Sequence, residues 1–303
     1  MSASLTNAVA GKASGAARTR RALAAGLQYA YLTIVCTVVL VPLVWMVVAS
    51  LTKGKLLSGV PLWPDFSKFS LEHYTYLFTY KSTSNAAFPD FVAAFLRSLT
   101  VAVVNTGAVV LLTTLTGYVF SRFRFAGRKP LLISFLLLQM FPSFMGMIAI
   151  FMIFRTFGWL NQPIYLVFIY AAGAVPYNTY LVRGYMRSIP ISIDEAATID
   201  GASRSKVFFR IMLPLATPII GFIAVNAFMA PWMDYMLPFQ LLNMQNQTVA
   251  IFLYRLTDPL ITLYYNPLNF MAGAIVLAVP ITLVQIWMQR FIVYGMAAGA
   301  AKG

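Results

Sequence analysis

The sequence predicts an all-α, polytopic membrane protein with six transmembrane helices and a cytoplasmic loop built from short helices. Three observations predict it: the composition, the length of the uncharged apolar runs, and the uneven distribution of Lys and Arg between those runs. Of 303 residues, 60% are hydrophobic and only 10% are charged, whereas about a quarter of a soluble domain is charged. Such a surface needs lipid as its solvent, so nucleic acid is a poor explanation for the net charge of +14.

Six runs are long and apolar enough to cross a membrane. A helix needs roughly 20 mostly apolar residues to span a hydrocarbon core of about 30 Å. The first run is too long for a cleaved signal peptide, whose apolar part is about 7–15 residues. A further uncharged stretch, 235–254, carries amides that lipid could not satisfy, which predicts a loop with an interfacial helix. The predicted spans cover about 27–51, 96–121, 130–155, 163–184, 213–236 and 268–291 of a transmembrane domain at 26–293.

The Lys and Arg residues orient these spans. With six spans both termini share a side, which would carry the N-terminal segment 1–25, two loops and the Gly/Ala-rich tail 294–303. That side holds roughly 15 of the Lys and Arg residues and the other side roughly 7. Basic residues favour the cytoplasmic side of short loops. We therefore expect a multi-pass membrane protein with both termini in the cytoplasm.

The loop at 188–214 is dense in local signals. Ser192 and Glu195 have the spacing of a capping box, which predicts a short helix beginning near Ile193. Gly201 can adopt the left-handed conformation that ends such a helix, and Ser203 can cap a second one. The pattern predicts a helix, a tight turn and a second helix lying along the membrane.

The first of these helices offers a face of small residues. Ile193, Ala196 and Ala197 share it, and Asp200 and Gly201 continue it. Such a face lets another protein approach the backbone closely, and Glu195 beside it is a charge available to a partner. Local physics is equally compatible with a basic helix pair on the membrane surface in which Glu195 only closes the capping box.

These residues resemble a known motif. The sequence Glu195, Ala196, Ala197, three residues, Gly201, nine residues and then Ile211, Met212, Leu213 and Pro214 resembles the EAA loop in the membrane subunits of binding-protein-dependent ABC importers. In that family the loop forms coupling helices that dock on an ATP-binding subunit, and the glutamate commonly pairs with a basic residue there. The resemblance implies an ATPase-coupling set of Glu195, Ala196, Ala197, Asp200, Gly201, Ile211, Leu213 and Pro214.

Three other segments resemble the carbohydrate importers of this family, most closely the smaller, six-span maltose/maltodextrin-type permease. They are FPSFMGMIAIF, VPYNTYLVRGYMRSIP and the terminal GMAAGAAKG. In that type the Gly-rich tail reaches the ATPase dimer, which implies contacts from Gly299, Lys302 and Gly303. A flexible end fits the same composition.

The resemblance also implies the partners. The chain has no phosphate-binding GxxxxGK[ST] loop, so ATP and Mg²⁺ would be bound by separate ATPase subunits, and this chain would be a non-catalytic subunit without a cofactor. A second, related permease and an extracellular or periplasmic sugar-binding protein complete the implied importer. The resemblance places it in a bacterial-type cell (inner, cytoplasmic) membrane. Its substrate would be an oligosaccharide of maltose type.

Polar side chains inside spans are the default candidates for a sugar pathway. Most such residues bond to a neighbouring helix instead. The outer loop 238–269, with Tyr264 and Tyr265, could contact the binding protein or anchor the chain at the interface. The only histidine, His73, has no cluster of further ligands for a metal, and we expect it at the surface. The pathway candidates are Asn105, Gln139, Tyr177, Asn178, Asn226, Trp232, Asp234 and Gln285.

Two other classes remain as alternatives. A secondary, ion-coupled transporter needs only the helices, but would be expected to carry intramembrane coupling residues and often an internal repeat. A membrane-embedded transferase usually needs clustered carboxylates, and the eight acidic residues of this chain lie outside the predicted spans apart from Asp234. Neither class would require the pattern between Glu195 and Pro214.

Overall fold

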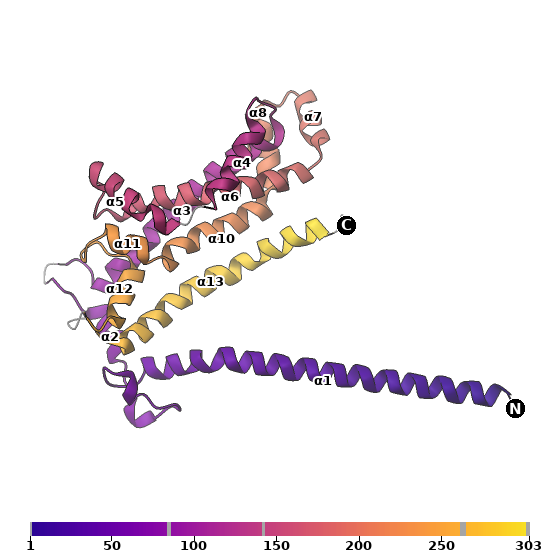
Figure 1. Ribbon diagram of the computed structural model, residues 1–303, viewed down its shortest axis with the longest axis horizontal. Helices are drawn as coiled ribbons and strands as arrows, with labels where there is room; N and C mark the ends of the chain where they lie inside the picture. The colour runs from indigo at the N-terminus through magenta and orange to yellow at the C-terminus, as the bar shows by residue number, and fades with distance from the viewer. Residues whose placement is uncertain (1, 84–85, 141–142, 261–264, 301–303) are drawn as a thin grey trace.

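The computed structural model describes residues 2–83, 86–140, 143–260 and 265–300, and over these ranges the chain is almost entirely helical (Figure 1). The only extended pairing among them is an isolated antiparallel bridge between Thr52 and Phe69. The all-α fold class predicted from composition is confirmed.

Two long helices, α3 (Asp90–Arg122) and α6 (Leu166–Ser188), form the centre of the molecule. They approach closely at Gly117, because a Cβ atom built there would lie 2.4 Å from Cγ1 of Val182. Small residues permit this kind of approach between membrane helices. Helix α10 (Thr217–Met233) packs against both, and α13 (Pro267–Ala300) packs on α10.

The N-terminal helix α1 (Ser2–Ser50) stands apart from this bundle. It contacts α13 and then extends away from the other helices (Figure 1). Its apolar side chains, such as Leu27, Ile34 and Val38, are more than half exposed. Such a surface needs lipid or another apolar partner to cover it.

The segment of the third predicted span is not one continuous helix. It consists of α4 (Arg128–Leu138), the 3₁₀ turn η3 (Ser143–Gly146) and α5 (Met147–Thr156). Helix α4 packs against α6, whereas α5 lies beside α11 at the opposite end of the α3–α6 pair (Figure 1). The segment therefore still runs the length of the bundle, in broken form.

The 188–214 loop folds into short helices: α7 (Ile191–Ile199), α8 (Arg204–Val207), the π-helical turn η5 (Phe208–Met212) and α9 (Leu213–Leu215). The chain bends by 77° between the helical stretch Arg204–Leu215 and α10. The stretch Arg204–Leu215 therefore runs across the direction of α10. The order of helix, turn and second helix agrees with the sequence pattern, and their position along the membrane stays a prediction.

The other end of the bundle, here called the distal end, comprises the described parts of residues 51–89 and 234–266. It contains the 3₁₀ turns η1 (Leu57–Gly59) and η2 (Phe66–Lys68) and the helices α2 (Glu72–Thr79), α11 (Met236–Leu241) and α12 (Val249–Thr257). The 3₁₀ turn η4 (Pro163–Tyr165) precedes α6. The amide-rich stretch 235–254 thus forms two short helices joined by a loop.

The prediction that His73 lies at the surface is wrong. Its side chain is 1% exposed, and its ring nitrogens bond to Oδ1 of Asn269 at 2.7 Å and to the carbonyl oxygen of Thr52 at 2.9 Å. Buried polar groups need such partners. Here they come from opposite ends of the chain, so His73 ties α2 to the start of α13.

Four helices in the described part of the chain are long and apolar enough to span a membrane, or up to five if the bent pair before α10 counts as one span. The broken α4–α5 segment accounts for the difference from six, so the count of six is compatible with this architecture. The chain is a multi-pass membrane protein, and the exact limits of its spans stay a prediction.

Candidate functional site

The 188–214 loop begins with a helix that ends in a well-defined turn. Gly201 has φ +80°, a conformation that a glycine adopts without strain. Its N–H donates to the carbonyl oxygen of Thr198 at 3.0 Å, and the N–H of Ala202 donates to that of Ala197 at 2.9 Å. These two bonds are the Schellman motif, and the prediction that Gly201 ends α7 is confirmed.

The predicted capping box at the start of α7 does not form. Pro190 occupies the N-cap position, no side chain caps it, and α7 begins at Ile191 rather than near Ile193. The proline ring fixes φ near about −65°. Pro190 has an extended ψ of 135°, so it lies outside the helix and α7 begins at the next residue. Ser192 therefore lies inside the helix, and Glu195 is left exposed at its surface.

Helix α7 has two different faces. Ala197 is only 8% exposed and belongs to the hydrophobic core formed with α8 and η5. Ala196 and Glu195 are exposed on the other side, and Ile199 is 86% exposed. The face of small residues predicted from the sequence is thus divided, with Ala196 pointing outward and Ala197 supporting the helix from inside.

Arg122, the last residue of α3, holds the inner face of α7. Its Nε atom forms an ion pair with Oδ2 of Asp194, and the two side chains are only 8% and 15% exposed. Its Nη2 atom donates to the carbonyl oxygen of Ile189 at 3.1 Å and lies 3.6 Å from the sulfur of Met212. One guanidinium group therefore joins the end of α3 to both sides of the 188–214 loop.

Sequence reasoning missed this link. The sequence pattern treats Lys and Arg residues such as Arg122 only as groups that orient the spans, and Asp194 is not among the predicted site residues. The only signal in the sequence was an acidic residue inside the most basic loop, which indicates an ion pair without naming the partner.

A groove of about 610 Å³ opens beside α7. Arg204 lies over the ring of Phe123, 4.8 Å from its centroid, and Tyr118 packs against the same ring at 5.8 Å. Glu195 and Ile199 contribute the α7 side. The groove thus combines a carboxylate with aromatic and aliphatic surface, a mixture found in protein contact sites.

The second half of the loop supports the bend into α10. Ser203 caps α8 as predicted, since its hydroxyl accepts the N–H of Lys206 at 3.3 Å. Met212 is fully buried in the core, with Ile211 and Leu213 packed against it. Pro214 is exposed at the bend. Of the predicted coupling set, Ile211 and Leu213 therefore pack inside the loop, whereas Glu195, Ala196, Asp200 and Pro214 are exposed at its surface.

Four of the predicted pathway residues take part in packing within the chain. Asn105 is fully buried and donates to the carbonyl oxygen of Ala227 on α10 at 2.7 Å. Asn178 is 7% exposed and Trp232 is 5% exposed. Asp234 accepts the hydroxyl of Tyr170 at 3.1 Å and the N–H of Met236 at 3.0 Å, ahead of α11.

The other four pathway candidates are exposed. Gln139 donates to the carbonyl oxygen of Gly173 at 2.7 Å, and Asn226 donates to that of Phe222 in its own helix at 2.8 Å. Tyr177 is 50% exposed, and Gln285 is exposed on α13. All four side chains therefore lie at the surface of the described bundle rather than in its core.

The residues of the predicted tail contacts lie at or beyond the end of α13. Gly299 is in the last turns of α13. Lys302 and Gly303 lie outside the described residues, as does Tyr264 of the aromatic pair in the outer loop.

Comparison with known families gives a match over most of the bundle. The model of the family described as binding-protein-dependent transport system inner membrane component matches residues 109–297. This range begins within α3 and includes the whole 188–214 loop.

Individual relatives match over nearly the whole chain. The galactooligosaccharides transport system permease protein GanQ of Bacillus subtilis is 35% identical over 287 residues, covering 94% of this chain and 98% of the relative. The maltodextrin transport system permease protein MdxG of the same organism is 36% identical over 294 residues, covering 95% and 99%. The maltose/maltodextrin transport system permease protein MalG of Salmonella typhimurium is 30% identical, covering 90% and 94%.

Solved structures share the fold. A chain of a bacterial ABC transporter involved in the import of the acidic polysaccharide alginate superposes with a TM-score of 0.72 at 20% identity, covering 87% of this chain and 94% of that chain. A chain of the inward-facing MetNI methionine ABC transporter superposes with a TM-score of 0.52 at 14% identity, covering 68% and 95%. At these identities the likeness concerns the fold alone.

Proposed function

The chain belongs to the family of binding-protein-dependent transport system inner membrane components, and we propose that it is the permease subunit of an ATP-driven oligosaccharide importer. Its relatives are named as transport system permease proteins, and such subunits are non-catalytic. In the proposed assembly it pairs with a second, related permease, two ATPase subunits that bind ATP and Mg²⁺, and an extracellular sugar-binding protein.

The substrate class rests on the relatives. Those named above handle galactooligosaccharides, maltodextrins and maltose. We propose a maltodextrin-type oligosaccharide as the substrate, with galactooligosaccharides as the second class to test. The proposed contacts to the sugar or to the second permease are the exposed polar side chains of Gln139, Tyr177, Asn226 and Gln285.

One observation carries the coupling proposal: the inner face of α7 is fixed by the Arg122–Asp194 ion pair, whereas its outer face is left uncovered by the rest of the described chain. Glu195, Ala196 and Ile199 are exposed. Exposure of an isoleucine side chain to water is unfavourable, and Ile199 is 86% exposed. A partner surface that covers Ile199 and offers a basic group to Glu195 would bury apolar area and pair a charge. The ATPase subunit is the proposed occupant of this face.

The Arg122–Asp194 ion pair could also transmit a movement of α7 to the long helices. When two ATPase subunits close on ATP, a shift of α7 would act on the end of α3 through the Asp194–Arg122 ion pair. It would also act on α10 through η5 and α9, which connect directly to α10. Rigid-body movement of packed helices is an established way to open a pathway to alternate sides of a membrane.

The proposed orientation puts the 188–214 loop and both termini in the cytoplasm, because the basic residues gather on that side. The tail residues Gly299, Lys302 and Gly303 are then proposed to contact the ATPase dimer. The distal end would face outward, toward the binding protein.

Reconstitution tests the function. The complex in vesicles, supplied with the cognate binding protein and internal ATP, is expected to take up maltodextrins, with lactose and galactooligosaccharides as comparison substrates. Uptake that is independent of ATP, by a chain that purifies from detergent without an ATPase, would instead support an ion-coupled secondary transporter.

A further inference from the structure

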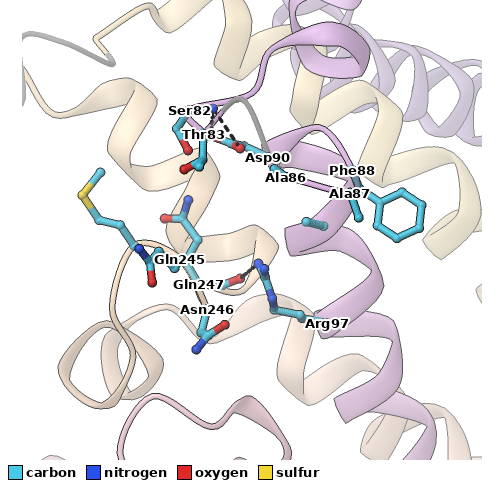
Figure 2. Close-up of a pocket in the computed structure, with 12 residues that line it drawn as sticks. Ser82, Thr83, Ala86, Ala87, Phe88, Asp90, Arg97, Gln245, Asn246 and Gln247 are labelled. Atoms are coloured by element: carbon cyan, nitrogen blue, oxygen red, sulfur yellow. Dashed lines mark hydrogen bonds between the residues drawn. The ribbon is translucent and has the colours of Figure 1, made fainter.

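A pocket of about 390 Å³ with a mixed polar and apolar lining lies at the distal end, remote from α7. Its walls come from the described residues of the segment before α3, from the start of α3 and from the loop between α11 and α12 (Figure 2). In Figure 2, Ser82, Thr83 and Asp90 lie along one side of the pocket, and Gln245, Asn246, Gln247 and Arg97 lie along the other. The volume falls within the range of small-molecule sites, about 300–1,000 Å³.

The walls of this pocket are held by bonds to the rest of the chain. The carboxylate of Asp90 accepts the N–H of Ser82 at 3.2 Å. The guanidinium of Arg97 donates to the backbone carbonyl of Gln247 at 3.3 Å, and Ser98, the next residue on α3, accepts the N–H of Val249 at 2.9 Å. The pocket is therefore largely preformed, which lowers the cost of binding.

One buried group in the pocket has no partner. The side chain of Gln247 is 7% exposed, and its Oε1 atom has no hydrogen-bond partner among the described residues. An unsatisfied buried acceptor destabilises a fold, and such groups are rare. A ligand that donates a hydrogen bond to Oε1 would remove this cost.

The charges of the pocket indicate the kind of ligand. Asp90 and Arg97 contribute one charge of each sign, so the pocket favours neither an anion nor a cation. Its amide, hydroxyl, carboxylate and guanidinium groups include both donors and acceptors, which suits a ligand whose groups can do both. Phe88, 52% exposed at the edge, offers an aromatic face. A neutral saccharide has this combination of hydroxyl groups and apolar ring faces.

We propose that this pocket is a saccharide-binding site on the outer face of the permease, separate from the pathway between the two permeases, in which Gln247 accepts a sugar hydroxyl and Arg97 and Asp90 bind its neighbours. The inference rests on the proposed function for the class of sugar. It adds a place where sugar is held before it enters the pathway.

A local fluorescent reporter can test the site in the assembled importer. The only cysteine, Cys36, is replaced by alanine, and a dye is attached after Gln245→Cys at the exposed edge of the pocket. Titration of the nanodisc complex with maltotriose, without binding protein, is expected to give a saturable signal. Gln247→Leu keeps the volume and removes the acceptor, and should weaken the apparent affinity at least about tenfold.

Gln240→Leu is the matched control, because Gln240 is exposed on α11 and does not line this pocket. It should leave the titration unchanged. The proposal is overturned if maltotriose gives no saturable signal up to about 10 mM, or if Gln247→Leu and Gln240→Leu bind maltotriose alike. It is also overturned if maltotriose changes the signal only when the binding protein is added as well. Uptake by the unlabelled wild-type complex decides the proposed function separately, since it needs no signal from this pocket.

Discussion

The 188–214 loop and the distal end are held together in different ways. The loop is organised by short-range turns and by one buried ion pair between Arg122 and Asp194, and it leaves the outer face of α7 bare. The distal end is organised by contacts between distant segments, such as the ring pair of Phe91 and Phe252 at 5.7 Å. It also buries polar groups, among them His73.

The two ends of the molecule therefore suit two different functions. A surface that docks a partner and transmits its movement needs exposed groups on an element with few attachments. A region that must keep its shape needs many attachments and few exposed groups. The comparison predicts that changes on the outer face of α7 remove function with little effect on stability, and that changes in the buried groups of the distal end do the reverse.

Replacing Glu195 should have the largest effect on transport. Glu195→Ala removes an exposed carboxylate, so the fold should be retained, while a coupling energy of about 1.4 kcal/mol or more would be lost, which lowers uptake at least about tenfold. Uptake and ATPase stimulation by the loaded binding protein, measured in vesicles, check this.

Two further variants sharpen that test. Asp65→Ala removes an exposed carboxylate that caps the 3₁₀ turn η2 at the distal end, a bond confined to neighbouring residues, and should leave uptake unchanged. Gly201→Val should act like Glu195→Ala, because Gly201 has φ +80° and open space around it, so the cost is conformational and falls on the turn that positions α7. Normal uptake by Glu195→Ala with the ATPase still bound would show that this face is not the docking surface.

Breaking the ion pair should affect both stability and coupling. Arg122→Leu leaves Asp194 charged and nearly buried, and removing one partner of a buried pair typically costs about 3 kcal/mol. The double variant with Asp194→Leu should recover much of the lost stability, since no charge is left unpaired. Thermal unfolding of the purified complex measures this difference.

The same variants distinguish a link from a mere packing contact. If the pair transmits movement from α7 to α3, the double variant should regain its thermal stability but not the stimulation of ATPase activity by the binding protein. Recovery of both together would mean that Arg122 and Asp194 only stabilise the loop.

Replacing His73 should lower stability alone. His73→Leu leaves Oδ1 of Asn269 and the carbonyl of Thr52 without their bonds in a buried region, at a cost of about 2 kcal/mol. The melting temperature of the complex should fall, while uptake per folded complex stays close to that of the wild type. Thr75→Ala, on the exposed face of the same helix, is the control. A selective loss of coupling in His73→Leu would contradict the division between the two ends.

The sequence predicted the loop better than the distal end because the loop depends on neighbouring residues. Gly201 and Ser203 act within three residues of their partners, so their roles can be inferred from local spacing. The capping box was wrong for a local reason too: Pro190 starts α7 two residues before the expected position. The third span was predicted as continuous because composition does not show where a helix breaks.

The missed side-chain contacts join distant parts of the chain. His73 and Asn269 are 196 residues apart, and Arg97 and Gln247 are 150 residues apart. Nothing in one sequence pairs them. The polar residues predicted for a pathway show the same limit, since Asn105 bonds to Ala227 across two helices, a partner that periodicity cannot identify.

The smallest expected effect belongs to the cap of α8. Ser203→Ala removes the hydroxyl that accepts the N–H of Lys206, which typically costs about 1 kcal/mol. Because α8 lies between α7 and the bend into α10, this loss should loosen the loop without exposing a buried charge, and Ser203→Asp should restore it. Hydrogen exchange over residues 203–208 should increase in Ser203→Ala, with uptake reduced less than twofold. A loss of uptake as large as that of Glu195→Ala would mean that α8 itself contacts the partner, and the docking surface would then extend beyond α7.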